Sequence, residues 1–324
     1  MNNPNAVILL PRLQVQNANA VSGPLTWGFP SPTAFAGFMH AMQRKVADEL
    51  ALRFEGVGIV CHRFEPQVSR PAGKYTQVFN LTRNPLTKEG ATAAIVEEGR
   101  AHMEISLLIA IQGRIDSDEI EFVAQRLMQV AHTMRLAGGS LLPQRQGKRY
   151  EPQLLTLPQS EVERDDIFRK FKRRLLPGFA LVQREDRLAD HLGEMRATNA
   201  NVNALDALLD LTRLNIEPDQ PNPDKPEEKQ WGIRRHPGWL VPIPVGYAAI
   251  SPLYPPGEVI NARDDGTPFR FVESLYSLGE WVSPHRLTSL QQLLWHHHSD
   301  MERGLYCCVN HYSKHQQQTI NNIV

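Results

Sequence analysis

The chain has 324 residues, and its 35 Lys and Arg residues balance its 35 Asp and Glu residues, so its formal net charge is zero. A neutral total excludes the strongly basic composition of many nucleic-acid-binding proteins, but it leaves room for a basic surface that acidic segments elsewhere compensate. Three cysteines argue against a disulfide framework. The first apolar run lacks preceding basic residues and stops at Pro11, and no run approaches the roughly 20 residues of a membrane span. We therefore expect a cytoplasmic protein.

Strand and helix patterns alternate through the first half of the chain. Apolar runs of strand length predict four strands, at 6–16, 56–64, 101–111 and 178–185. Apolar residues at helical spacing predict helices at 33–52, which Ser31 would cap, and at 116–134. The order of these elements is typical of a ferredoxin-like domain, the topology of RNA-recognition domains, so we expect an α+β fold. Because that fold carries many functions, the order alone does not decide what the chain binds.

The second half of the chain is less regular. Helices are expected at 167–176, at 186–214 and around 284–303, and the tail from Asn310 is polar. Residues 216–230 have the proline and acidic content of a surface linker or loop. We therefore expect a ferredoxin-like domain at 1–215, this linker, and a C-terminal region at 231–324 that packs on the first domain.

Three segments are rich in cations and almost free of carboxylates, although the total charge is zero. They are residues 66–88, 135–150 and 167–176. The first overlaps an insertion at about 69–99 that is too long for a tight hairpin, and it interleaves Tyr75 and Phe79 with cations. A lone charged run is usually a solvated face, but three such runs around one predicted sheet favour RNA binding. RNA phosphates need cations, and splayed bases stack on aromatic rings.

Common enzyme motifs are missing from the sequence. It has no phosphate-binding loop, no dinucleotide fingerprint, no zinc-protease motif and no nucleophile elbow. One alternative stays open, a metal-independent endoribonuclease in which His62, His102 or His132 acts as a general acid and base beside a ribose hydroxyl. A histidine satisfied by packing is the commoner reading of each of these positions.

One metal-like cluster occurs near the end of the chain. Its members are His296, His297, His298, Cys307, Cys308, His311 and His315. Thiolate and imidazole ligands suit zinc, but adjacent cysteines without a CxxC partner are poorly spaced for a tetrahedral site. We expect no metal and no cofactor.

Several long motifs resemble a known family. They include QNANAVSGPLTWGFPSP at 16–32, GVGIVCHRFEPQVSRPAGK at 56–74, VFNLTRNPL at 78–86, MRLAGGSLLP at 134–143 and PGWLVPIPVGYAAISPLYPPGEV at 237–259. These motifs are similar to the second subunit of the type I-F CRISPR surveillance (Csy) complex, a Cas-five-type repeat-associated protein. The resemblance runs from about residue 6 to about residue 306, and the tail at 307–324 lies outside it.

The resemblance implies a structural rather than a catalytic role. Members of this family cap the 5′ repeat-derived handle of the guide RNA (crRNA), and an inserted thumb, here residues 69–99, belongs to their ferredoxin-like domain. The implied partners are the crRNA handle, the large Csy subunit as a heterodimer partner, and the terminal subunit of the backbone filament, with target DNA nearby and no membrane. The Gly-rich loop of the family corresponds to Gly138 and Gly139, which Ser140 follows.

Twelve residues are candidate RNA contacts. The preferred ones lie in the insertion, namely Arg70, Lys74, Phe79, Asn80 and Arg83, and Arg63 and Arg135 are second choices. Asn17 and Asn19 would read base edges, although turn residues that satisfy the local backbone are an equal reading. Gly138, Gly139 and Ser140 would offer close backbone approach to phosphates, or the glycine pair would instead end a helix.

Other aromatic residues also have two readings. We expect Trp27 and Phe29 to anchor the loop after the first strand. The Pro-rich segment 237–257, with Trp239, Tyr247 and Tyr254, is either a partner surface or a packed aromatic core.

Overall fold

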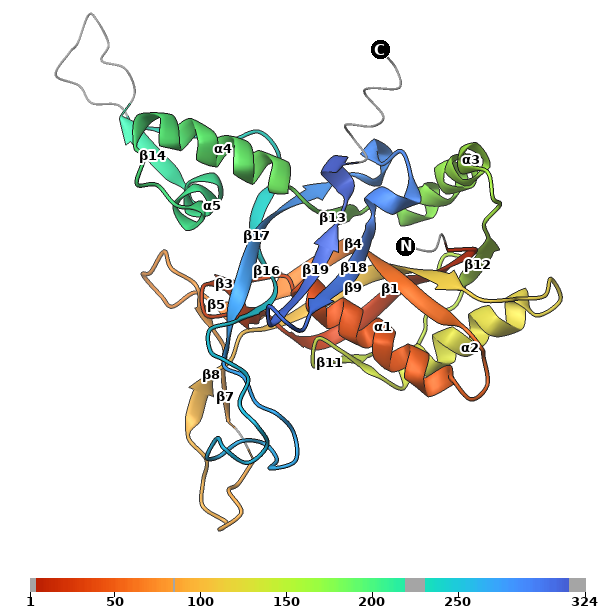
Figure 1. Cartoon of the computed structure of the whole chain (residues 1–324), viewed down its shortest axis with the longest axis horizontal. Helices are drawn as coiled ribbons and strands as arrows, with labels where there is room; N and C mark the ends of the chain where they lie inside the picture. Colours follow the sequence, from red (N-terminus) through yellow and green to blue (C-terminus); the bar gives the residue numbers. More distant parts are fainter. Residues whose placement is uncertain (1–3, 84, 219–230, 315–324) are drawn as a thin grey trace, which may run out of the picture.

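The centre of the molecule is a large antiparallel sheet (Figure 1). A computed structural model describes residues 4–83, 85–218 and 231–314, without the side chains of residues 81–83, 96 and 97. The first part of the sheet contains β1 (Ala6–Asn19), β4 (Arg53–Pro66), β9 (Arg100–Gln112), β10 (Arg135–Leu136), β11 (Gly139–Leu141) and β12 (Gln153–Thr156). β1 pairs with β9 on one side and with β11 and β12 on the other, while β4 lies beyond β9. Helices with an antiparallel sheet confirm the predicted α+β class.

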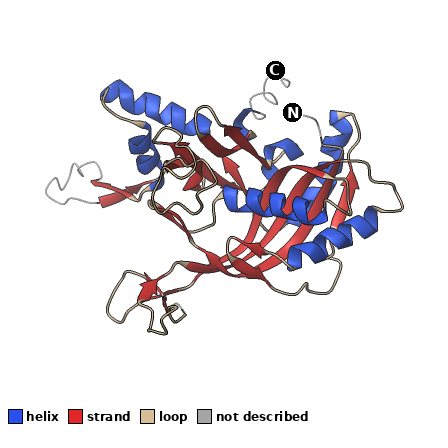
Figure 2. Cartoon of the chain, turned by 60° about the horizontal axis from the view of Figure 1, so that its bottom comes forward, coloured by secondary structure: helices blue, strands red, loops and turns tan. Residues whose placement is uncertain are grey.

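Helices cover both faces of this sheet, as Figure 2 shows from another side. They are α1 (Pro32–Val46), α2 (Ile120–His132), α3 (Glu161–Phe171) and the 3-10 helix η1 (Lys172–Leu175). α1 and α2 share a core with Ile8 and Leu10 of β1, whereas α3 and η1 share a second core with Val7 and Leu9. Strands buried on both faces have continuous apolar sequences, which explains why β1, β4 and β9 could be predicted. Ser31 caps α1 as predicted, since its Oγ accepts a 3.1 Å hydrogen bond from the backbone N–H of Thr33.

Five strands from the second half of the chain close a ring on β4. They are β13 (Phe179–Gln183), β16 (Leu240–Ala249), β17 (Val272–Val282), β18 (Leu294–Asp300) and β19 (Leu305–Asn310). Their order is β13-β17-β16-β19-β18, and both ends of this run pair with β4. β13 pairs at Val60 and Cys61, and β18 pairs at Val57 and Gly58. The strand predicted at 178–185 therefore forms, but next to β4, because β11 and β12 occupy the free edge of β1.

The helix predicted around 284–303 is wrong. This segment contains two short 3-10 helices, η2 (Pro284–Arg286) and η3 (Leu290–Gln292), and then β18. Trp295 on β18 is fully buried, and its Nε1–H donates a 2.8 Å hydrogen bond to the carbonyl of Leu181 on β13. Pairing with β4 and β19, which are distant in sequence, overrides the local helical spacing of the leucines.

The helix predicted at 186–214 is two helices. α4 (Glu185–Thr198) and α5 (Ala204–Thr212) pack against each other and are followed by the hairpin of β14 (Asn215–Pro218) and β15 (Trp231–Arg234). Asn203 breaks the helical run because its side chain accepts from the backbone N–H groups of Leu205 and Asp206, which starts a new helix. The helix predicted at 167–176 begins earlier, at Glu161, and its end is η1. Residues 219–230 of the predicted linker and residues 315–324 of the tail lie outside the described residues.

The segments between the sheet strands carry short hairpins. They are β2 (Val21–Gly23) with β3 (Thr26–Trp27), β5 (Val68–Ser69) with β6 (Val78–Phe79), and β7 (Leu81–Arg83) with β8 (Ile95–Glu97). The insertion predicted at 69–99 thus contains most of two hairpins. In Figure 1 the loop after β5 projects to the left of the sheet, and the β7–β8 hairpin projects below it.

Candidate nucleic-acid interface

The candidate interface is built at the end of β1. A register shift follows Val15, and Asn17 within it has a positive φ of 58°. The β10–β11 hairpin turns through Ala137 and Gly138, whose φ values of 49° and 75° fit a two-residue hairpin turn. The backbone N–H of Asn19 donates a 2.8 Å hydrogen bond to the carbonyl of Ala137, so the bulge and the hairpin turn meet.

Gly139 allows the hairpin to approach β1 closely. A Cβ on Gly139 would lie 2.8 Å from both the backbone N of Ala18 and the carbonyl O of Gln16, so no side chain fits there. Gly138 has open space around it and is constrained only by its positive φ. The glycine pair therefore belongs to a strand hairpin, and the helix-end reading of it is wrong.

Two polar candidates on this hairpin face solvent. Arg135 on β10 and Ser140 on β11 lie opposite each other, and both side chains are exposed. Because Ser140 also pairs with Gln16 of β1, these two side chains lie at the same end of the sheet as Asn17.

The two asparagines of β1 make different contacts. The side chain of Asn19 hydrogen-bonds the backbone carbonyl and N–H of Val21 at 2.8 and 3.1 Å, so it satisfies the local backbone. Asn17 Oδ1 instead accepts a 2.5 Å hydrogen bond from Nε2 of Gln67, which also lies 3.2 Å from Nε2 of His102. The backbone N–H of Asn17 donates a 3.3 Å hydrogen bond to Nδ1 of His102. Among the described residues nothing accepts from the side-chain Nδ2 of Asn17, which leaves this group for a ligand. Gln67 was missed in the sequence, and its place in the acid-free run 66–88 was the only signal.

The insertion joins this surface at its base. The backbone N–H of Asn80 donates a 3.2 Å hydrogen bond to the carbonyl of Gln67. The ring of Phe79 stands perpendicular to that of Trp27, with ring centroids 5.3 Å apart. Arg70 and Lys74 lie in the exposed loop between β5 and β6, whereas Arg83 lies on the other hairpin and its side chain is outside the described part. The structure therefore brings Phe79 and Asn80 to the interface and puts the three cations on two separate hairpins.

The candidate cations differ in their partners. Arg63 forms a 2.6 Å ion pair with Glu65, and both side chains are exposed. Among the described residues, Arg70, Lys74 and Arg135 form no ion pair. These three cations can approach phosphates without first giving up a carboxylate.

The three histidines of the endoribonuclease alternative lie on β4, β9 and α2. His62 uses both ring nitrogens, with Nδ1 2.7 Å from the carbonyl of Pro177 and Nε2 2.6 Å from Oγ of Ser106. Burial lowers the pKa of His62 to about 4 and also lowers that of His132. His102 contacts Gln67 in the interface. No described contact joins two of these histidines into an acid–base pair.

The predicted metal-like cluster is spread along two strands. His296, His297 and His298 on β18 pair in register with β19, where Cys308 and Cys307 lie opposite His297 and His298. Neighbouring strand residues point to opposite faces, which separates the two thiols. His315 lies outside the described residues.

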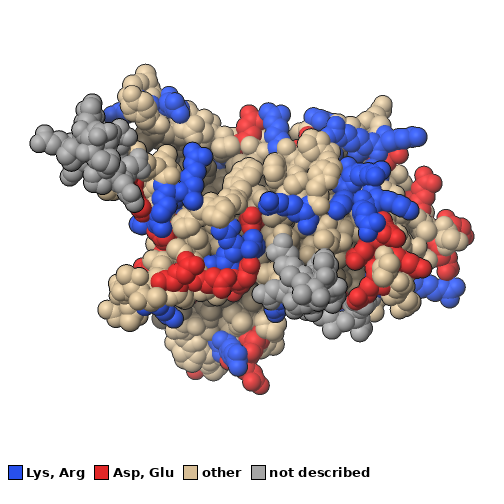
Figure 3. All heavy atoms as spheres, turned by 90° about the horizontal axis from the view of Figure 1, so that it is seen from above, with Lys and Arg blue, Asp and Glu red and all other residues tan. Residues whose placement is uncertain are grey.

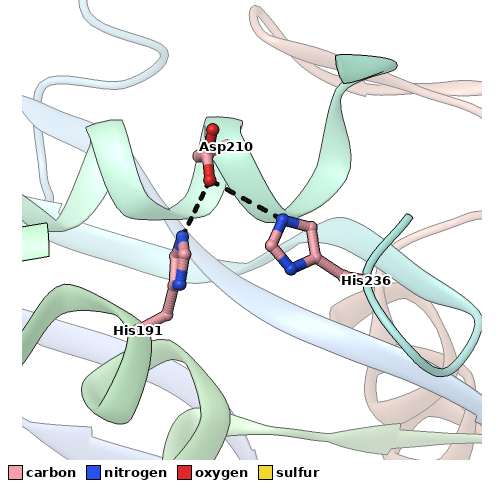
Figure 4. Close-up of side chains that lie close together, drawn as sticks. All are labelled: His191, Asp210 and His236. Atoms are coloured by element: carbon pink, nitrogen blue, oxygen red, sulfur yellow. Dashed lines mark hydrogen bonds and ion pairs between the residues drawn. The ribbon is translucent and has the colours of Figure 1, made fainter. Parts of the chain in front are cut away.

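A different His–Asp–His group occurs in the helical segment (Figure 4). Asp210 Oδ2 lies 2.9 Å from Nε2 of His191 and 3.6 Å from Nε2 of His236. Arg213 and Arg234 also contact this carboxylate, at 3.0 and 2.9 Å. Two guanidinium groups already neutralise Asp210, so the group fits a structural ion cluster better than a cation site.

No helix in the described part of the chain is both long and apolar enough to cross a membrane.

Comparison with known proteins agrees with the motifs read from the sequence. The family model described as CRISPR-associated protein (Cas_Csy2) matches residues 8–308. The chain is 56% identical over 309 residues to CRISPR-associated protein Csy2 of Pseudomonas aeruginosa strain UCBPP-PA14, and the match covers 94% of each protein. The resemblance inferred from the sequence is thereby confirmed, and the chain belongs to the Csy2 family, the second subunit of the type I-F CRISPR (Csy) complex of antiviral defence.

Proposed function

We propose that the chain is a non-catalytic subunit that binds the 5′ handle of the crRNA in the cytoplasmic type I-F complex. The observation that carries this proposal is the meeting of the β1 bulge, the β10–β11 turn and the base of the insertion on one surface. This surface combines the free amide of Asn17, the aromatic ring of Phe79 and the cation of Arg135. Single-stranded RNA is bound by such groups, through base edges, stacking and phosphate contacts.

The arrangement of the central sheet supports a ferredoxin-like domain. The antiparallel order β12-β1-β9-β4, with α1 and α2 packed on one face, has the βαββαβ connectivity of that fold. We propose that this domain spans 1–215 with the insertion 69–99 as its thumb. A linker or loop at 216–230 and a C-terminal region at 231–324 that packs on the first domain complete the proposed organisation.

The proposed partners are the large Csy subunit, in a heterodimer, and the terminal subunit of the backbone filament, with target DNA close by. The exposure of Tyr247 on β16 supports a partner contact within 237–257 rather than a packed aromatic core. A partner subunit at this position would cover the exposed ring.

The test is guide retention in the assembled complex. Combined Arg70→Ala, Lys74→Ala and Arg83→Ala substitutions should weaken crRNA binding and make it less dependent on salt, by about 0.7 in the log–log slope for each phosphate that is no longer neutralised. The matched control is Arg44→Ala with Lys45→Ala, two exposed cations at the end of α1. If the triple variant retains its guide as the control does, the thumb assignment is wrong. Cleavage of repeat RNA by the purified chain, abolished on changing His62, His102 or His132, would overturn the non-catalytic role.

A further inference from the structure

An aromatic pocket opens between the first half of the chain and the C-terminal strands. It has a volume of about 420 Å³, within the range of small-molecule sites. Six aromatic residues line it, namely Trp27, Phe29, Phe64, Phe179, Trp239 and Trp281. The Phe29 and Trp281 rings meet at right angles with centroids 4.9 Å apart, and the Phe179 and Trp239 rings are 5.2 Å apart.

The rim of this pocket is open to solvent. Trp27, Trp239 and Phe179 are 60%, 56% and 44% exposed, although each is a large ring that folding normally buries. Thr26 also lines the pocket.

A basic cleft includes Leu176, which is close in sequence to Phe179 of the pocket. It has a volume of about 450 Å³ and is lined by Lys148, Arg149, Arg173, Arg174 and Leu176. Arg174 donates hydrogen bonds to the carbonyl oxygens of Lys148 and Glu151 and to the side chain of Gln153, so it shapes the cleft. Figure 3 shows Lys and Arg side chains gathered in the right half of the top face, around the position of α3, which η1 follows.

Three cations of this cleft are available to a ligand. Lys148, Arg149 and Arg173 are exposed, and none of them forms an ion pair with the carboxylates that the structure describes. Three unpaired cations around one hollow are typical of a phosphate-binding surface.

Hydrogen bonds fix the backbone of residues 176 and 177, which lies between the pocket and the cleft along the chain. Arg12 donates to the carbonyl oxygens of Leu176 and Pro177 at 2.9 and 3.3 Å, and His62 contacts the carbonyl of Pro177. Leu176 lines the cleft and Phe179 lines the pocket, so only two residues separate the two sites along the chain.

We propose that the pocket receives one unstacked base of single-stranded RNA, while Lys148, Arg149 and Arg173 hold phosphates of neighbouring nucleotides. Rings suit the base, cations suit the phosphates, and Trp27 joins the pocket to Phe79 of the candidate interface. This inference rests on the proposed function, and it extends the RNA path to the opposite side of β4, away from β9.

The test uses the assembled complex of the full chain with its partner subunits and a crRNA that carries its handle. Ultraviolet crosslinking with peptide mapping should find a nucleotide attached to peptides that contain Phe179 or Trp239. Trp239→Ala should weaken crRNA binding about 5- to 150-fold, the effect expected for one stacked base, and Trp239→Phe should restore most of it. The matched control is Trp231→Ala, which truncates a similarly exposed tryptophan on β15.

Further outcomes separate this inference from the proposed function. Arg173→Gln should reduce the salt slope by about 0.7 without changing the melting temperature of the chain. If Trp239→Ala binds crRNA like Trp231→Ala while the triple variant at 70, 74 and 83 releases it, the pocket assignment is overturned and the proposed function stands. A photoreactive residue at 239 that crosslinks only to a protein subunit would also overturn it. Absence of any RNA crosslink to the chain would overturn both.

Discussion

The guanidinium of Arg12 on β1 donates a 2.8 Å hydrogen bond to the carboxylate of Glu104 on β9, and the Arg12 side chain is only 5% exposed. The same guanidinium also holds the carbonyl oxygens of Leu176 and Pro177. Arg12 thus ties the central sheet to the turn that enters β13, at a backbone position with positive φ.

Arg12→Ala should destabilise the chain by about 3–5 kcal/mol, because it leaves a largely buried carboxylate without its main partner. The measurement is the free energy of unfolding from denaturant titration. Arg63→Ala is the matched control: it removes an ion pair that is 71% and 54% exposed and should cost less than about 1 kcal/mol. If Arg12→Ala destabilises the chain no more than Arg63→Ala does, the Arg12–Glu104 pair is not a strongly stabilising contact.

The two glycines of the β10–β11 hairpin should respond differently to substitution. Gly139→Ala forces a Cβ against the backbone of β1 and should cost about 1–3 kcal/mol. Gly138→Asn should change stability by less than about 0.5 kcal/mol, since its surroundings are open and asparagine tolerates positive φ. Denaturant midpoints of both variants check this, and equal effects would show that the hairpin does not pack tightly on β1.

Stability should fall as the pH drops from 7 to 5. Burial outweighs the opposing effect of the Pro177 carbonyl and lowers the pKa of His62 to about 4, against an ordinary value of 6.5. Between these values the unfolded chain binds the proton and the folded chain does not. The contribution of His62 is therefore complete above pH 6.5 and is lost toward pH 4, with a decrease of about 2 kcal/mol at pH 5.

Unfolding free energies measured across this pH range check the effect. His62→Gln should flatten the pH dependence, and His298→Gln, at an exposed position on β18, should leave it unchanged. The remaining slope in His62→Gln comes partly from His40 and His132, because burial lowers the pKa of both. An unchanged slope in His62→Gln would contradict the assignment.

Asp210 should hold α4, α5 and β15 together. Burial alone would raise the pKa of Asp210, but hydrogen bonds from His191, Arg234 and Arg213 keep it below its usual value. Asp210→Asn should speed amide hydrogen exchange in α4 and α5, with a destabilisation of about 1.5–3 kcal/mol for the charged hydrogen bonds. Asp190→Asn, at an exposed position on α4, should leave exchange as it is. A rise in melting temperature on adding zinc would instead make Asp210 a metal ligand.

The sequence was most informative where burial leaves a local pattern. β1, β4 and β9 are buried on both faces, so their apolar runs identified them, and Ser31 identified the start of α1. Of the strands in the ring, β13 was predicted from its apolar run, but β16, β17, β18 and β19 left no such pattern. They are held by partners far away in sequence, and β16 contains Pro242 and Pro244.

The candidate interface, too, could be predicted only in part from the sequence. Residue type was enough to single out Asn17, Gly138 and Phe79, but not to find what joins them. The contact of Asn17 with Gln67 depends on a bulge in β1 and on the register of β4 against β9, and no short-range pattern encodes either. The aromatic pocket was missed for a similar reason, since its six rings come from four strands and two loops that are distant in sequence.

The closed ring on β4 has a consequence for synthesis of the chain on the ribosome. β4 is finished at Pro66, yet the strand that completes its second edge, β18, begins only at Leu294. More than two hundred residues must therefore emerge before this edge is covered, and until then it exposes unpaired peptide groups that can pair with another chain. A partner subunit or chaperone that binds this edge during synthesis would protect the nascent chain from aggregation.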